Sequence, residues 1–343
     1  MGKIRLTFRP KQATKKLLKG LKDRDQYVIS NRFGLETGER RTLESIGQEY
    51  GITRERVRQI ENYALNAIRK SESFEEAQTI FEEIKTIITD MGGVVGEDSL
   101  LSEIGEDEIS QNHIHLYLVL GDQFTKQKEN NHFKHRWIVD NDTADKVHDA
   151  LLAIRDELSK HDLVPESDIL KRVADHLEGV ADKYRNDEHA GRFLNLSKSL
   201  GKNPLGEWGR AESPAVRTRG IKDYAYLVMR RHGSPMHFRE VAKSITETFD
   251  KKTHVATTHN ELIKDPRFVL VGRGLYGLGE WGYKEGVVRD VIKQLISEHG
   301  PMNKDEIVDR VLKERYLKRN TILVNLMNNK HFKKTSDGKY DLA

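Results

Sequence analysis

The chain has 343 residues, of which 33% are charged and 36% hydrophobic, and its formal net charge is +4 at pH 7. This length and polarity predict several small domains with modest cores in a soluble, cytoplasmic protein. The absence of cysteine excludes disulfides, thiolate metal sites and cysteine nucleophiles, and no apolar run approaches the ~18 residues of a membrane span or forms the core of a signal peptide.

Charge is distributed unevenly along the first third of the chain. Residues 1–70 contain 17 Lys and Arg against 8 Asp and Glu, whereas residues 71–110 contain one Lys against 12 Asp and Glu. A basic segment attracts phosphate, and an acidic one repels it. We expect residues 1–12 to form a flexible basic arm. The acidic segment is interpreted either as a solvated helical face or as a shield for the basic one.

Residues 41–70 have the pattern of a helix-turn-helix. Thr42 and Thr53 are the predicted N-caps of two helices, and Gly51 ends the first of them. Apolar residues recur at helical spacing in both helices, at Leu43, Ile46, Tyr50, Val57, Ile60, Ala64 and Ile68.

The second helix carries a polar face made of Arg54, Glu55, Arg58 and Gln59. An arginine can form a bidentate pair with guanine and a glutamine with adenine, while a glutamate accepts from the cytosine amino group. This face is therefore predicted to read base edges in the major groove. The alternative is a solvated face on an ordinary helical hairpin.

Two stretches here resemble region 4 of bacterial sigma-70 factors: RDQYVISNRFGL at residues 24–35 and RTLESIGQEYGITRERVRQIENYAL at residues 41–65. The resemblance implies a region 4-like domain at residues 13–72 that reads a −35-type promoter element. It implies that Arg54, Glu55, Arg58 and Gln59 read bases, and that Arg24, Arg32, Thr53 and the backbone N–H of Leu43 contact phosphates. It also implies docking on the β-subunit flap of RNA polymerase, through the apolar surface between the first helices.

The rest of the chain repeats a pattern with a period of roughly 65 to 75 residues. Each unit has an amphipathic helix, a short strand-like link, two further helices and an aromatic or β-branched close, which is the order of a winged helix. We therefore predict a mainly α fold with small β-wings, in which winged-helix-like units at residues 73–141, 142–217, 218–283 and 284–343 follow the helix-turn-helix.

The third unit resembles the HARE-HTH domain of the RNA polymerase delta subunit, on HGSPMHFREVAKSI and THNELIKDPRFVLVGRGLYGLGEWGY. Residues 268–271 are a predicted strand, and Gly272 and Gly274 permit the turn after it. The helices expected to enter a DNA groove are residues 254–264 here and residues 318–328 in the fourth unit. Arg319, Asn320 and Asn325 are a candidate second DNA contact.

Other chemistry is weakly indicated. His113, His115, His132 and His135 suggest a metal site only if an alternating strand places the first two on one face, and no further ligands accompany them. No phosphate-binding loop, GxSxG or HExxH motif occurs, so we expect neither enzyme activity nor a cofactor or metal.

The sequence thus predicts a transcription protein that binds double-stranded DNA and RNA polymerase in the nucleoid, without membrane contact. About twenty residues precede the region 4-like part, so no module that melts the −10 element is recognised, and a regulator or accessory factor is expected. One alternative is a polymerase-binding protein that reads no DNA sequence. Another is the DNA-specificity component of a restriction system, in which HARE-HTH units also occur.

Overall fold

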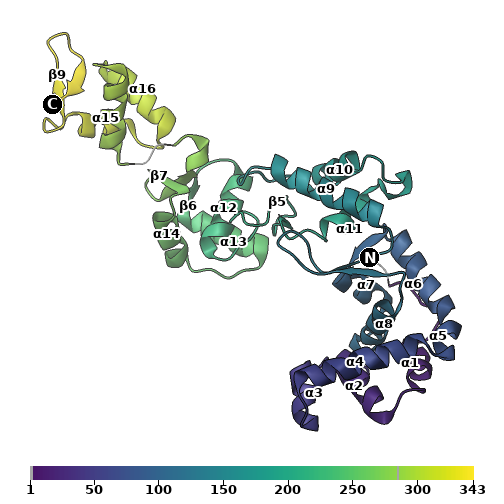
Figure 1. The fold of residues 1–343 in the computed structure, drawn as a ribbon. Coiled ribbons are helices and arrows are strands. Elements are labelled where there is room, and N and C mark those ends of the chain that lie inside the picture. Colours follow the sequence, from purple (N-terminus) through teal and green to yellow (C-terminus); the bar gives the residue numbers. More distant parts are fainter. Residues whose placement is uncertain (1–2, 284–285) are drawn as a thin grey trace. The chain divides into compact units, whose positions relative to one another are not determined.

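The structure is a computed structural model that describes residues 3–283 and 286–343 (Figure 1). The chain forms two compact units, which are described separately. The first contains residues 1–201 and 208–211, and the second contains residues 202–207 and 212–343. The predicted start of the fourth winged helix, at residue 284, lies outside the described residues. In the part of the chain that the structure describes, no helix is long and apolar enough to cross a membrane.

The chain begins with four helices, here called the head: α1 (Pro10–Leu18), α2 (Asp23–Phe33), α3 (Leu43–Tyr50) and α4 (Arg54–Arg69). The hydroxyl of Thr42 accepts from the N–H of Ser45 at 3.1 Å, and that of Thr53 accepts from the N–H of Arg56 at 3.2 Å. Gly51 ends α3 in the left-handed region, with φ +62°. These caps confirm the predicted helix-turn-helix, whose own small core includes Val28, Ile46, Val57 and Ile60.

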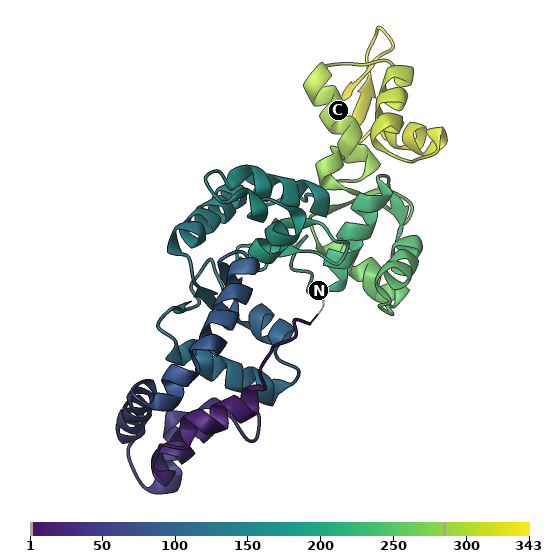
Figure 2. The ribbon, with the colours of Figure 1, turned by 90° about the vertical axis from the view of Figure 1, so that its right-hand side faces the viewer.

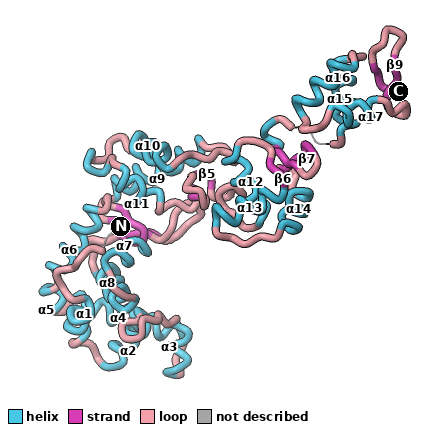
Figure 3. Tube along the Cα trace, turned by 180° about the vertical axis from the view of Figure 1, so that it is seen from behind, coloured by secondary structure: helices cyan, strands magenta, loops and turns pink. Residues whose placement is uncertain are grey.

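After the short helix α5 (Glu72–Glu76), the first winged helix consists of α6 (Gln78–Asp90), β1 (Val94–Gly96), α7 (Glu97–Ile104), α8 (Glu108–Leu120), β2 (Thr125–Gln127) and β3 (Arg136–Ile138). Its antiparallel sheet has the order β1-β3-β2, so the last strand lies between the other two. Figure 3 shows that the strands of the chain are short beside its helices. This arrangement is the predicted helix, strand, two helices and β-hairpin.

The second winged helix follows with α9 (Asn141–Glu157), α10 (Glu166–His176), the 3-10 turn η1 (Asp182–Tyr184), α11 (Asp187–Leu194), β4 (Leu200–Lys202) and β5 (Trp208–Arg210). A single antiparallel bridge between Val164 and Trp208 takes the place of the first strand. Its core is centred on side chains such as Ile169, Phe193 and Leu194, which are all buried.

The second unit contains two more winged helices. The third has α12 (Ile221–His232), β6 (Met236–His237), α13 (Phe238–Phe249), α14 (Val255–Lys264), β7 (Phe268–Gly272), β8 (Leu275–Leu278) and the 3-10 turn η2 (Gly279–Trp281), with sheet order β6-β8-β7. The fourth has α15 (Val288–His299), α16 (Lys304–Glu314), α17 (Arg319–Leu326), β9 (Phe332–Lys334) and β10 (Tyr340–Leu342). An isolated bridge joins Met302 to Tyr340. The mainly α fold with tandem winged helices is thus confirmed.

The head and the first winged helix share one hydrophobic core. Leu17 of α1 and Phe33 of α2 are buried together with Phe81 of α6 and Tyr117 of α8. Helix α8 lies against α1 and α2 (Figure 1), and eight of its 13 residues are buried. The apolar surface between the first helices was expected to receive the polymerase flap. In this structure, α8 of the same chain covers it instead.

Buried hydrogen bonds reinforce this packing. Asn112 of α8 donates its side-chain amide to the carbonyl oxygens of Gly34, at 3.1 Å, and Gly38, at 2.7 Å. Its amide oxygen accepts from Nε of Arg40 at 2.6 Å. The single side chain of Asn112 therefore fixes the loop between α2 and α3 against the first winged helix.

Arg69 makes a second polar connection at the far end of α4. Its Nε donates to the carbonyl oxygen of Leu120 at 3.0 Å, and Nη2 donates to that of Val119 at 2.8 Å. These two carbonyls belong to the last turn of α8, where a helix leaves its carbonyl oxygens without internal partners. Arg69 thus caps α8 and ties α4 to it.

The N-terminal arm is packed, contrary to the expected flexible segment. The N–H of Ile4 donates to the carbonyl oxygen of Glu103 at 2.8 Å, and the N–H of Thr7 donates to Oε1 of Glu83 at 2.7 Å. Ile4, Leu6 and Phe8 are partly buried against the shared core. These apolar residues alternate with polar ones, a pattern that indicates an extended segment with one buried side. The basic charge of the segment had instead suggested a flexible arm. Figure 2 shows the arm running from the N-terminus into α1.

The histidines considered as metal ligands do not lie on an alternating strand. His113 and His115 lie two residues apart on α8, so their side chains leave the helix in nearly opposite directions. Both are buried, and burial lowers the pKa of each. Among residues 3–283 and 286–343, no three His, Cys, Asp or Glu side chains are grouped as metal ligands.

Acid should destabilise the first unit through His148. Burial, assisted by the neighbouring Arg136, lowers the pKa of His148 from 6.5 to about 4, and its Nε2 accepts from Nε of Arg136 at 2.8 Å. Between pH 6.5 and 4, the imidazole of His148 is therefore protonated in the unfolded chain and neutral in the folded chain. The free energy of unfolding falls as the pH is lowered through this range. In thermal unfolding of the full chain, His148→Gln keeps an acceptor for Arg136 and should reduce this loss.

His176 provides a control of opposite sign. A hydrogen bond with the carbonyl oxygen of Arg172 raises the pKa of His176, and the carboxylate of Glu157 acts in the same direction. His176 therefore adds to the free energy of unfolding at a pH below its pKa in the unfolded chain. This contribution is lost as the pH rises through its higher pKa in the folded chain. His176→Gln should therefore lower the stability below about pH 6.5 by a constant amount and leave the loss between pH 6.5 and 4 unchanged. Equal acid sensitivity in both variants and the wild type would contradict the assignment to His148.

Candidate nucleic-acid interface

The first two turns of α4 present the four predicted base readers to solvent. Arg54, Glu55, Arg58 and Gln59 are all exposed. Val57, on the inward side of the same turns, is fully buried and anchors this part of the helix to the small core of the helix-turn-helix. The sequence therefore places apolar anchors and polar readers on opposite sides of one helix, as the helical period requires.

Three of the four predicted readers, Glu55, Arg58 and Gln59, make side-chain contacts within α4. Nε and Nη2 of Arg58 donate to the two carboxylate oxygens of Glu55, at 2.9 and 2.6 Å. This hydrogen bond lowers the pKa of Glu55 and raises that of Arg58, so both remain charged at neutral pH. Gln59 accepts from Nη1 of Arg56 at 3.0 Å. Pairs between exposed side chains contribute little to stability, so DNA can replace them at small cost.

The predicted phosphate contacts fall into two groups. Arg24 is exposed near the start of α2, and Thr53 and Leu43 lie at the N-termini of α4 and α3. Backbone N–H groups in a first helical turn have no internal acceptor and favour anions, as the prediction requires. Arg32 is different, because its Nε lies 3.3 Å from Glu61 and its Nη1 donates to the carbonyl oxygen of Arg41. It links α2 to α4 and to the segment that precedes α3.

The structure adds basic residues that the sequence analysis did not single out. A hollow of about 370 Å³ beside the reading face is lined by Lys22 and Arg24 of the α2 entry and by Arg56, Gln59 and Tyr63 of α4. Tyr63 is 62% exposed. The spacing of Arg56, Gln59 and Tyr63, at i, i+3 and i+7, is the sequence signal that could have identified this second stripe of α4.

The third helices of the winged helices differ in what they expose. In the first, α8 is buried in the shared core and cannot enter a groove. In the third, α14 exposes the aliphatic residues Val255 and Ile263. In the fourth, α17 carries the candidate second DNA contact. Arg319 forms an ion pair with Asp305, Asn320 is exposed, and the side chain of Asn325 donates to the carbonyl oxygen of Thr321 at 2.8 Å, within its own helix.

Arg315, which lies in the lysine- and arginine-rich fourth unit, is not part of a basic surface. It is buried, and its guanidinium donates to the carbonyl oxygens of Leu270 at 2.9 Å and Gly286 at 3.0 Å. It therefore joins segments of the second unit. Sequence alone cannot separate such a buried arginine from the exposed lysines around it, because its acceptors are backbone groups distant in the chain.

Comparison with protein families agrees with the geometry at two places. Residues 17–70 match the family model described as Sigma-70, region 4. Residues 219–281 match the HARE-HTH model, a helix-turn-helix domain whose description names ASXL and restriction endonucleases. Both matches are to helix-turn-helix domains, and they coincide with the head and with the third winged helix. The chain therefore carries helix-turn-helix domains of DNA-binding type, and double-stranded DNA is the partner that they support.

Proposed function

We propose that this protein is a transcription regulator or polymerase accessory factor that reads a −35-type promoter element through α4. The observation that carries the proposal is the exposed set Arg54, Glu55, Arg58 and Gln59 on the first turns of a capped helix. This set lies within the segment that matches Sigma-70, region 4. The proposed role is binding rather than catalysis.

In the proposed complex the N-terminal half of α4 enters the major groove. Arg54 and Arg58 suit guanine, Gln59 suits adenine and Glu55 suits the cytosine amino group. Arg24, Thr53 and the N–H of Leu43 then face phosphates on either side of the groove, with Lys22 and Arg56 extending that contact. Phosphate contacts set the position of a protein on DNA, and base contacts give specificity.

The decisive experiment is selection of duplexes bound by the full chain from a random library. Enrichment of a TTGACA-like hexamer is the expected result. An unenriched pool that still binds would show that the head recognises only phosphate, and the proposed reading function would then be withdrawn.

Replacement of Arg58 by alanine should weaken binding to the selected duplex by roughly 10- to 100-fold, because a bidentate arginine–guanine pair contributes discrimination of that order. Binding to a random duplex should change little. Fluorescence anisotropy at a fixed salt concentration measures both. Equal losses on the two duplexes would contradict base reading by Arg58.

Polymerase binding is a second candidate, and the match to Sigma-70, region 4 favours it. In this chain, however, α8 covers the apolar surface between α1 and α2. Flap docking there would require the head to separate from the first winged helix, so we propose that any polymerase contact uses another surface. Pull-down of core polymerase by the full chain without DNA tests this candidate directly.

A further inference from the structure

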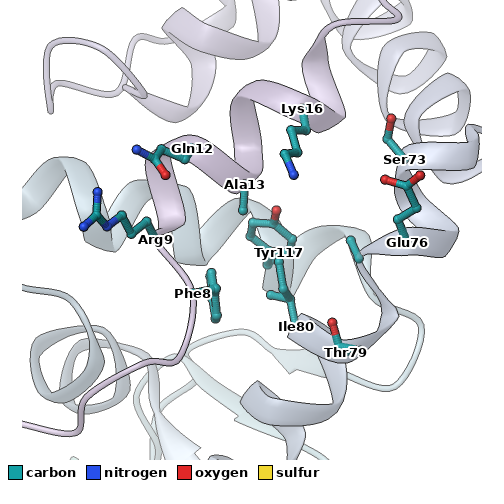
Figure 4. Close-up of a pocket in the computed structure, with 11 residues that line it drawn as sticks. Phe8, Arg9, Gln12, Ala13, Lys16, Ser73, Glu76, Thr79, Ile80 and Tyr117 are labelled. Carbon is teal, nitrogen blue, oxygen red and sulfur yellow. The ribbon is translucent and has the colours of Figure 1, made fainter.

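The charged surfaces of the chain differ in composition. The hollow where the N-terminal arm and α1 meet α5 and α6 combines the cations of Arg9 and Lys16 with the carboxylate of Glu76 (Figure 4). In the fourth winged helix, by contrast, the signs are separated along the chain. Residues 318–343 contain six Lys and Arg against two Asp, whereas residues 288–317 contain six charges of each sign. The cationic surplus of this domain therefore lies in α17 and in the hairpin β9–β10, which are its third helix and its wing.

Four of these cations form what is here called the lysine surface. Lys318 is the N-cap of α17, Lys330 lies in the turn that follows this helix, and Lys333 and Lys334 belong to β9. All four are exposed. Within residues 3–283 and 286–343, none of their ammonium groups takes part in an ion pair or a hydrogen bond. The lysine surface therefore has four positive charges that a negatively charged partner could neutralise.

The two carboxylates of this segment are engaged elsewhere. Asp337, at the tip of the hairpin, accepts from the hydroxyl of Thr335 at 2.5 Å and lies 3.9 Å from Nζ of Lys339. Asp341 lies opposite Lys333 in the hairpin register, and its carboxylate accepts from the next backbone N–H at 2.8 Å. Neither acid is within ion-pair distance of the lysine surface in the described part of the chain.

Hydrogen bonds of Asn328 fix the turn between α17 and β9. Its side-chain oxygen accepts from the N–H of Lys330 at 3.1 Å, and its carbonyl oxygen accepts from the N–H groups of His331 and Phe332, at 3.0 and 3.1 Å. Phe332 is the first residue of β9 and is buried. The backbone that carries Lys330 is thus already ordered, so a partner bound there would not have to order a free loop.

The chemistry of this surface fits the phosphates of a duplex. A lysine ammonium is a compact charge that binds phosphate without requiring one geometry. Binding of single strands also uses exposed aromatic side chains, on which unpaired bases stack. Within residues 318–343 the aromatic rings of Phe332 and Tyr340 are buried or half-buried, and none is exposed. The surface therefore offers contacts to a phosphate backbone and no platform for single-stranded bases.

Helix α17 offers few groups that could read base edges. Arg319 is held in its ion pair, and the amide of Asn325 donates within the helix. Val324 and Met327 are 69% and 61% exposed and have no donor. Only the exposed Asn320 remains of the three residues suggested by the sequence. A contact made here would therefore depend on phosphates, which carry no sequence information directly.

We propose that the fourth winged helix binds the sugar-phosphate backbone of duplex DNA, without regard to sequence, through the lysine surface. This contact adds affinity for any duplex. It lies in the second compact unit, and it does not depend on base reading by α4. Neutralised phosphates release counterions, so each lysine contact should contribute about 0.9 to the slope of log affinity against log salt concentration.

The test is fluorescence anisotropy of the full chain on a random-sequence duplex, between about 50 and about 200 mM salt. Lys333→Gln combined with Lys334→Gln should reduce the salt slope by about 1–2 and weaken binding at about 0.1 M salt roughly tenfold. Lys333→Arg combined with Lys334→Arg keeps both charges and should bind like the wild type. Unchanged affinity and slope in the glutamine variant would overturn the proposal.

A second double variant controls for net charge. Lys160 and Lys171 are exposed lysines of the second winged helix, and replacing both with glutamine removes the same charge from the chain. This control should bind the random duplex with nearly the wild-type affinity and slope. Equal losses in the two glutamine variants would show that only net charge matters, and tighter binding of a single strand than of the duplex would contradict the choice of partner.

The result is distinguishable from that of the base-reading test. Lys333→Gln combined with Lys334→Gln should weaken binding to a TTGACA-containing duplex and to a random duplex by the same factor, whereas Arg58→Ala should affect the first alone. Failure to select a hexamer would remove the proposed reading by α4 and leave the lysine surface in place. A loss confined to the TTGACA-containing duplex in the lysine variant would contradict sequence-independent binding.

Discussion

Residues 1–72 expressed alone should fail to form the head seen in the full chain. Leu17, Leu18, Phe33 and Leu35 are buried in a core that also contains side chains of α6 and α8. Exposing even half of the surface of four such side chains costs about 3–6 kcal/mol. Stability amounts to roughly 0.05–0.15 kcal/mol per residue, or about 4–11 kcal/mol for 72 residues, so this loss is comparable to the whole stability that the fragment could have.

Circular dichroism during heating checks this expectation. Residues 1–211 contain the complete first unit, together with residues 202–207 of the second, and should unfold cooperatively. Residues 1–72 should show reduced helix content and a broad, non-cooperative change. A sharp transition in the short fragment, with the helix content of four helices, would show that the head folds without the first winged helix.

Asn112→Ala should lower the free energy of unfolding of residues 1–211 by about 2–4 kcal/mol. The substitution removes three hydrogen bonds, to Gly34, Gly38 and Arg40, and leaves their polar groups without the partner that the fold provides. Each buried polar group left unpaired costs about 1–3 kcal/mol, and water reaching the exposed Arg40 and the partly exposed Gly38 reduces the total.

Urea denaturation followed by tryptophan fluorescence measures this loss. Asn62→Ala is the matched control, because Asn62 is an exposed asparagine within a helix of the same unit. That variant should keep or slightly raise stability, since alanine favours a helix more than asparagine does. If the two variants unfold at the same urea concentration, the Asn112 bonds contribute no net stability.

Local features of the fold were predictable because they depend on short-range patterns. Thr42 and Thr53 cap the helices that they were expected to cap, and Gly274 adopts φ +70° in the turn between β7 and β8. The winged-helix order follows from apolar period and turn residues in the same way. These signals are contained in windows of a few residues, so tertiary context does not change them.

The errors concern contacts between distant segments. His113 and His115 were considered as neighbours on a strand, but the long apolar run around them is a helix buried on nearly all sides, whose periodicity is hidden. The apolar surface between the first helices, where the resemblance implies flap docking, packs against α8 of the same chain, and polymerase binding stays a prediction. A sequence shows that a surface needs covering, and it does not show which segment covers it.

Site residues were predictable where their exposure depends on one helix, and not where it depends on packing between distant segments. The exposure of Arg54, Glu55, Arg58 and Gln59 is a property of one amphipathic helix, which the spacing predicts. Arg32 looked equally available in sequence, but its guanidinium is engaged by Glu61 and by a backbone oxygen. Whether a basic residue faces solvent or another helix depends on packing that no local pattern contains.

The hydrogen bonds between Arg69 and the last turn of α8 fix the C-terminal end of α4 to the first winged helix. Helix α4 has 16 residues and is therefore about 24 Å long. A tilt of about 5° at the Arg69 end would displace the base-reading end by about 2 Å over that length, more than a hydrogen bond tolerates. In the proposed DNA complex, small movements of the first winged helix would therefore be magnified at the N-terminal end of α4, and mutations far from the groove would alter recognition without touching a base.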